Sequence, residues 1–168
     1  MKAKILKAMQ RCCSQEGATF PRVYWREGEV CALDMVVAVR YSSAETREVE
    51  PAQFWQLPED ALSRVRPSEE VRLVEGGYLM PYGQTVGQDF GNTPGLRDTW
   101  KTLAGKADPK AKWPELLSTD PAHLMRVLKV YEAVGALPII RNDGRALWLE
   151  GWNPKTREQV YALVMGCR

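Results

Sequence analysis

The sequence is short of the residues from which metal sites are usually built. Its 168 residues include one histidine, His123, and four cysteines with no Cys-x-x-Cys pair. Zinc sites need several such ligands at fixed spacings, so the sequence predicts no metal centre. It also lacks an apolar run of about 20 residues, the length that a membrane-spanning helix needs. Lys and Arg number 23 against 21 Asp and Glu, so the net charge of +2 does not by itself indicate nucleic-acid binding.

Motifs of known catalytic chemistries are missing as well. No glycine-rich phosphate loop and no nucleophile elbow follows a predicted strand. Carboxylates in predicted turns do not have the spacing of a metal site; they are Asp34, Asp89, Asp98 and Asp108. His123 falls in the first turn of a predicted helix, where an exposed or capping histidine is commoner than a catalytic base. We therefore expect a protein that is not an enzyme and that needs no cofactor.

The cysteines and the N-terminal residues favour a reducing compartment. Cys12 and Cys13 are adjacent, and Cys31 and Cys167 are far away in the sequence, which is typical of buried, idle thiols rather than of a disulfide framework. Residues 1–6 contain two lysines but no apolar stretch of a signal peptide, and they are predicted to begin a helix. These features predict a cytoplasmic protein with no membrane contact.

The chain has enough apolar material for a folded core, with 45% hydrophobic and 26% charged residues. Helices are predicted at residues 2–15, 51–62 and 119–134. Strands are predicted at residues 22–26, 30–34, 35–41, 47–50, 70–75, 78–80, 84–86, 136–141, 146–150 and 159–165. This order predicts an α+β fold with helices packed on one face of antiparallel sheets. We expect an N-terminal unit at 1–86, an aromatic-containing loop or insertion at 87–118, and a C-terminal unit at 119–168.

Basic side chains cluster on one side of two predicted helices. On a helical wheel, Lys4, Lys7 and Arg11 lie opposite the apolar stripe of the first helix, and Arg126 and Lys129 lie opposite that of the last. Both faces are expected to be poor in acidic residues. They fit either an ordinary solvated surface or a surface that follows phosphates without reading sequence. Because these faces carry no aromatic residues, duplex DNA is the more natural ligand than a single strand.

Several segments resemble the bacterial sliding clamp, the β subunit of DNA polymerase III. Residues 119–130 read Thr-Asp-Pro-Ala-His-Leu-Met-Arg-Val-Leu-Lys-Val and are followed by Leu-Pro-Ile-Ile-Arg at 137–141 and Ala-Leu-Trp-Leu at 146–149. Residues 161–168 read Tyr-Ala-Leu-Val-Met-Gly-Cys-Arg, where clamps end Met-Pro-Met-Arg, and residues 32–35 resemble the Ala-Thr-Asp-Gly-like turn of clamps. The resemblance covers residues 1–86 and 119–168. The terminal motif lacks the proline, and the chain is less than half as long as a three-domain clamp. It resembles one clamp domain with a loop and an extra helical unit, of the kind encoded by phages or other mobile elements.

The resemblance implies a clamp fold whose helices face duplex DNA and whose sheets form the outside. The implied function is that of a DNA polymerase processivity factor, or of a related protein that associates with duplex DNA. The residues implied on the DNA side are Lys4, Lys7, Arg11, Arg126 and Lys129. Short peptide motifs of polymerases or of the clamp loader would bind an apolar cleft that includes Pro138, Val164 and Met165. A single-domain chain would encircle DNA only as a homo-oligomer, and exposed edge strands could form the joint.

The six tryptophans support an alternative from another class of function. Trp25, Trp148 and Trp152 lie on or beside predicted strands and fit core or sheet-face packing. Trp55, Trp100 and Trp113 are nearer predicted loops, where an exposed aromatic side chain can anchor a protein partner. In this alternative the chain is a clamp-fold interaction protein, such as a phage-encoded inhibitor of a host or defence complex, without clamp activity on DNA. Trp100 and Trp113 would then contact the host target protein.

Overall fold

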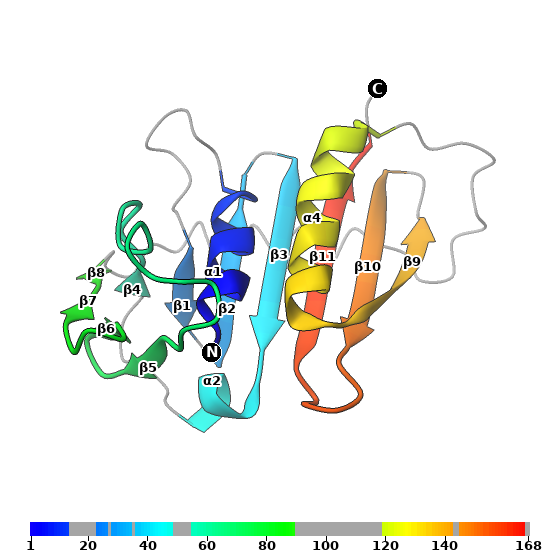
Figure 1. Cartoon of the computed structure of the whole chain (residues 1–168). Coiled ribbons are helices and arrows are strands. Elements are labelled where there is room, and N and C mark those ends of the chain that lie inside the picture. The colour runs from blue at the N-terminus through cyan, green and yellow to red at the C-terminus, as the bar shows by residue number, and fades with distance from the viewer. Residues whose placement is uncertain are drawn as a thin grey trace.

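The computed structural model describes residues 1–13, 23–26, 28–34, 36–48, 55–89, 119–142 and 145–166. In these residues the fold is α+β, as predicted (Figure 1). The main sheet has eight antiparallel strands in the order β8-β4-β1-β2-β3-β11-β10-β9, and a second sheet has the order β5-β6-β7. The helices are α1 (Ala3–Gln10), α2 (Ala44–Glu48) and α4 (Pro121–Val134). The strands are β1 (Tyr24–Arg26), β2 (Glu29–Leu33), β3 (Val37–Ser42), β4 (Trp55–Gln56), β5 (Arg72–Val74), β6 (Gly77–Leu79), β7 (Thr85–Val86), β8 (Gln88–Asp89), β9 (Leu137–Asn142), β10 (Ala146–Trp152) and β11 (Gln159–Met165).

The main sheet is built from two similar units that meet at its centre. Each unit is a helix followed by three antiparallel strands, α1-β1-β2-β3 in the first and α4-β9-β10-β11 in the second. The last strands of the units, β3 and β11, pair antiparallel, with Val39 opposite Ala162. The strand order β1-β2-β3-β11-β10-β9 therefore has an approximate two-fold axis between β3 and β11.

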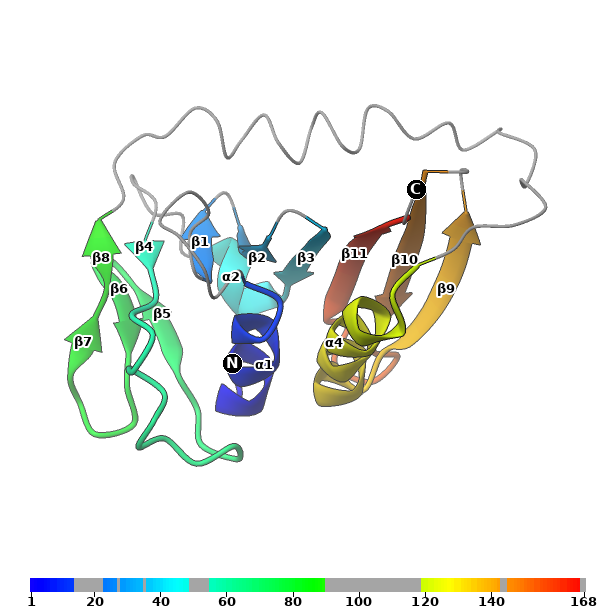
Figure 2. The same ribbon diagram turned by 90° about the horizontal axis from the view of Figure 1, so that it is seen from above.

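Both long helices cover the same face of this sheet, as predicted. Viewed from above, α1 and α4 lie side by side on one side of the strands (Figure 2), and the two helices contact each other. The apolar stripe predicted for the first helix is buried; in α1 and the turn after it the stripe comprises Ile5, Leu6, Met9, Cys12 and Cys13. In α4 the buried residues are Val127, Val130, Tyr131 and Val134. These side chains share one core with sheet residues such as Trp25 and Val164.

Helix α4 begins and ends where its sequence predicts. The side chain of Asp120 accepts a hydrogen bond from the N–H of Ala122, and Pro121 occupies the first turn. At the other end Gly135 adopts the left-handed conformation with φ of 76°, and the N–H of Ala136 donates to the carbonyl of Tyr131. Local sequence is therefore enough to set both ends of this helix.

Two predictions between residues 44 and 62 are wrong. Residues 44–48 form helix α2, which overlaps the strand predicted at 47–50, because Ser43 and Thr46 cap it reciprocally: each side-chain oxygen accepts from the other residue's N–H, at 3.2 and 2.9 Å. Trp55 and Gln56 form strand β4 rather than part of a helix. Trp55 pairs with Trp25 of β1, and this cross-strand contact outweighs the helical pattern of the segment. Residues 49–54 lie outside the described part of the chain.

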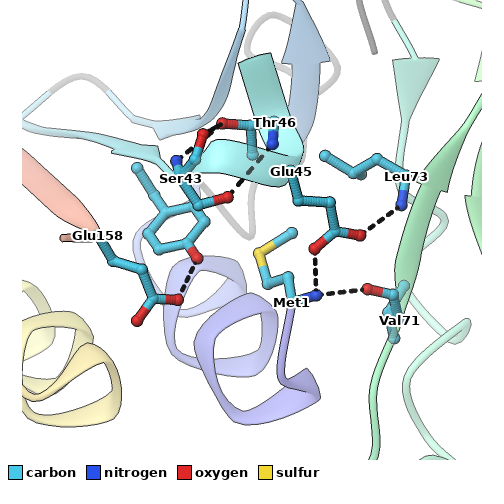
Figure 3. Close-up of polar contacts among 8 residues, drawn as sticks. Met1, Ser43, Glu45, Thr46, Val71, Leu73 and Glu158 are labelled. Atoms are coloured by element: carbon cyan, nitrogen blue, oxygen red, sulfur yellow. Dashed lines mark hydrogen bonds and ion pairs between the residues drawn. The ribbon is translucent and has the colours of Figure 1, made fainter. Parts of the chain in front are cut away.

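The N-terminal residue is fixed between α2 and the second sheet (Figure 3). The amino group of Met1 donates to Oε2 of Glu45 at 2.6 Å and to the carbonyl of Val71 at 2.9 Å. The other carboxylate oxygen of Glu45 accepts from the N–H of Leu73 at 3.1 Å. One carboxylate thus connects the start of α1, helix α2 and strand β5, and it sets where the second sheet lies beside α1.

In the described ranges, no helix is long and apolar enough to cross a membrane.

Candidate nucleic-acid interface

The five predicted DNA-contacting residues all lie on the neighbouring helices α1 and α4 or on the turn that follows α1. The structure therefore brings them to one face of the molecule. Their side chains differ in how available they are to a ligand. Lys4 and Arg11 are exposed, and the side chain of Lys129 is 49% exposed, whereas Lys7 and Arg126 are partly buried.

Lys7 is held by the segment that flanks α1. Its Nζ donates to the carbonyl of Val65 at 2.6 Å. The same segment also runs alongside the start of α1, where the N–H of Lys4 donates to the carbonyl of Pro67 at 3.0 Å. Lys7 therefore stabilises the contact between this segment and α1. It adds positive charge to the helix face, but its side chain is not available to move onto a ligand.

Arg126 has a structural role. Its Nη1 lies 3.0 Å from Oδ2 of Asp34 in the turn between β2 and β3, and 3.4 Å from the carbonyl oxygen of Arg11. Its Nη2 donates to Nδ1 of His123, which places that histidine in a polar cluster at the start of α4. The side chain of Asp34 is only 10% exposed, so this ion pair is largely shielded from water. No local sequence pattern indicates this pair, because Asp34 and Arg126 are far apart in the chain.

Lys129 has an acidic neighbour on the same helix. Its Nζ lies 2.6 Å from Oε2 of Glu132, and both side chains are about half exposed or more. The hydrogen bond from Lys129 and its positive charge lower the pKa of Glu132, and the charge of Lys4 acts in the same direction. The prediction that α4 turns an acid-poor face outward is therefore wrong at Glu132. Because exposed ion pairs contribute little, phosphate can replace this partner.

We expect Glu132→Gln to strengthen binding of duplex DNA, by about 3-fold at low salt, because it removes the acid that competes for Lys129 and Lys4. Fluorescence anisotropy with a labelled duplex measures the effect. Glu75→Gln is the control, because Glu75 is exposed in the turn between β5 and β6 and the charge change is the same. Equal affinities of the two variants would show that Glu132 does not face the DNA.

The residues predicted for a peptide cleft are not brought together. Val164 is fully buried in the core beneath the helices, whereas the neighbouring Met165 packs with the cluster on the opposite side of the sheet. Pro138 lies opposite Gly151, and Val164 lies opposite Leu147. These positions are four residues apart along β10, or about 13 Å. No single cleft includes all three residues.

Two of the four tryptophans in the described ranges lie as expected, and two do not. Trp25 is fully buried in the core, and Trp148 is partly buried on β10. Trp152, expected to pack on the sheet, is 52% exposed, and Trp55 is in strand β4 rather than in a loop. Trp100 and Trp113, the predicted anchors for a host protein, lie outside the described residues.

The cysteines in the described part of the chain, Cys12, Cys13 and Cys31, are buried, as predicted. Burial raises the pKa of Cys12 and that of Cys13 to about 12. Both side chains therefore stay protonated at neutral pH and are poor nucleophiles and poor metal ligands. Cys167 is outside the described residues.

No group of three or more His, Cys, Asp or Glu residues that could hold a metal ion occurs within the described ranges.

Comparisons with protein-family models, with curated proteins and with solved structures give no match.

Proposed function

We propose that the protein is a non-catalytic, sliding-clamp-like protein that associates with duplex DNA without reading its sequence. The observation that carries this proposal is the pair of adjacent helices, α1 and α4, on one face of a sheet made of two similar units. This arrangement fits the resemblance to the sliding clamp, in which helices face the duplex. The helices direct Lys4, Arg11 and Lys129 away from the sheet. Spaced lysines and arginines on a rigid face can neutralise phosphates, and such contacts carry no sequence information.

The cations that contact DNA should be those that the fold does not already use. Lys7 donates to Val65, and Arg126 pairs with the shielded Asp34, so replacing either residue would disturb the fold as well as the surface. Lys4, Arg11 and Lys129 are exposed enough to exchange solvent or a surface partner for phosphate. We therefore assign the movable phosphate contacts to these three residues, with Lys7 and Arg126 adding to the local potential.

Reversing the three exposed cations to glutamate should abolish binding of duplex DNA at moderate salt. For the unchanged protein, the logarithm of the affinity should fall linearly with the logarithm of the salt concentration between about 50 and about 200 mM. Loss of three phosphate contacts should reduce that slope by roughly 3 and weaken binding more than 10-fold. Anisotropy titrations with two duplexes of unrelated sequence measure both quantities. The affinities for the two duplexes should be equal.

The matched control reverses Arg72, Arg145 and Lys155, which are exposed but lie outside α1 and α4. The change in net charge is the same, so a general electrostatic effect would weaken binding in both variants equally. A selective loss in the helix variant supports the proposal. No binding by the unchanged protein at low salt contradicts it and leaves the alternative of a clamp-fold interaction protein.

A further inference from the structure

Among the described residues, strand β9 forms one end of the main sheet, and its outer edge is apolar. It is the last strand in the sheet order, and among the described strands only β10 pairs with it. Leu137 is 80% exposed, Ile139 47% and Ile140 42%, and Trp152 on the neighbouring strand is 52% exposed. Protein edge strands usually carry charges that prevent further pairing, but residues 137–140 contain none. Leu137, Ile139 and Trp152 lie on the face of the sheet away from the helices, where such exposed apolar side chains mark an interaction surface, and Ile140 lies on the other face.

The approximate two-fold symmetry of the sheet indicates what this edge can accept. Strand β1 occupies the place in the first unit that β9 occupies in the second. The outer edge of β1 is covered by the antiparallel strand β4, with Tyr24 opposite Gln56 and Trp25 opposite Trp55. In the described residues no strand has this position beside β9. An antiparallel strand from outside the chain would complete the second unit as β4 completes the first.

We propose that the outer edge of β9 pairs with β9 of a second copy of this chain, antiparallel and across a two-fold axis. The alternative is head-to-tail addition, in which β9 pairs with β8 of the next copy at the other end of the sheet. Within the described residues β8 comprises two positions, 88 and 89, so head-to-tail addition would offer β9 a much shorter partner than a second β9 does. Self-pairing instead places apolar side chains against each other, and the same patch serves both copies.

The faces of the sheet define the register of this pairing. Residues that lie opposite each other in antiparallel strands share a face, so Leu137 and Ile139 are on the face away from the helices, together with Trp152. A two-fold axis perpendicular to the sheet and centred on Ile139 puts this residue opposite itself in the second copy and puts Leu137 opposite Arg141. Arg141 already lies 3.9 Å from its own Glu150, and no like charges face each other in this register. The helices of both copies then lie on the same side of the joined sheet.

The association should be weak. The interface consists mainly of two short strands, and Pro138 has no N–H to donate across it. Small interfaces of this kind have low affinity, so we expect dissociation constants in the micromolar range and a dimer that forms as the protein is concentrated.

Sedimentation equilibrium of the whole chain at increasing concentration should show monomers and dimers without larger species. Ile139→Lys places two positive charges opposite each other, and it should weaken dimerisation at least 10-fold. Leu137→Lys should also weaken dimerisation. Because Leu137 is more exposed than Ile139, this substitution should disturb the fold less. Met125→Lys is the control, because Met125 is 52% exposed on α4 and lies away from β9. Circular dichroism establishes that each variant is folded.

The register has a separate test. In the proposed register a cysteine at position 139 lies opposite its copy, within the Cα distance that a disulfide spans, so Ile139→Cys should form a covalent dimer on mild oxidation. Met125→Cys should not. A chain that is monomeric at all concentrations, a dimer that persists in Ile139→Lys, or a series of larger oligomers would each overturn the proposal. None of these measurements uses DNA, so the outcome is independent of the proposed DNA binding.

Discussion

Replacing Gly151 with alanine should destabilise the protein by about 3 kcal/mol, at the upper end of the cost of overpacking a core. A Cβ atom built on Gly151 would overlap the carbonyl oxygen of Leu137 and would lie 2.9 Å from Cε1 of Tyr131. The first contact is with the backbone of the neighbouring strand and the second is with a buried ring. Tyr131 is itself fixed, because its hydroxyl donates to the carbonyl of Val160 at 3.1 Å. Neither neighbour can move without disturbing the packing of α4 on the sheet.

Urea unfolding monitored by tryptophan fluorescence measures this loss. Gly83→Ala is the control, because a Cβ at Gly83 meets nothing within 4 Å and only the positive φ of 85° is strained. That strain costs about 1 kcal/mol. If both variants lower the free energy of unfolding by the same amount, β9, β10 and α4 do not pack as closely around Gly151 as the structure shows. A loss of dimerisation in folded Gly151→Ala would also be expected, because β9 must shift to accept the methyl group.

Asp34→Ala should lower the free energy of unfolding by about 3 kcal/mol, because one carboxylate makes three contacts. Oδ1 accepts from the N–H of Val36 at 2.7 Å and from that of Val37 at 2.6 Å, and Oδ2 pairs with Arg126 at 3.0 Å. The alanine variant leaves a partly buried guanidinium without its carboxylate and loses the turn contacts. Asp34→Asn keeps the acceptor for the turn and should cost about half as much.

A double-mutant cycle with Arg126→Met isolates the ion pair from the turn. The coupling free energy between the two positions should be about 1 to 2 kcal/mol. The same variants separate stability from DNA binding. Arg126→Met should lower the free energy of unfolding clearly and should weaken DNA binding only slightly, through the loss of one charge. Lys4→Gln should weaken DNA binding clearly and leave the free energy of unfolding nearly unchanged. An Arg126→Met variant that is fully stable but does not bind DNA would contradict the structural role assigned to Arg126.

Local sequence was sufficient for the elements whose signals lie within a few residues. The proline and aspartate at the start of α4, the glycine at its end and the largely apolar run of residues 159–165 predicted those elements almost residue by residue. The apolar stripe of the first helix was correct. In α4 the prediction was right for Val127, Tyr131 and Val134, whereas the predicted Leu124 and Leu128 are only partly buried and Val130, which was not predicted, is buried. The first helix was predicted to residue 15, whereas α1 ends at Gln10 and the chain continues as a turn to residue 13. The capping pattern of Ser43 and Thr46 was present in the sequence, and with glutamate in place of Thr46 it would have been the usual signal of a helix start.

For the candidate site, the sequence by itself determined which residues occupy the outer face of each helix, because a periodicity of 3.6 residues fixes the side on which each residue lies. Only the tertiary structure decided which of these cations remain available, since the partners of Lys7 and Arg126 come from segments distant in the chain. The same is true of strand β4, which exists because β1 lies beside it, and of the outer edge of β9. Pairing across a sheet depends on which segments meet in space, and no local pattern contains that information.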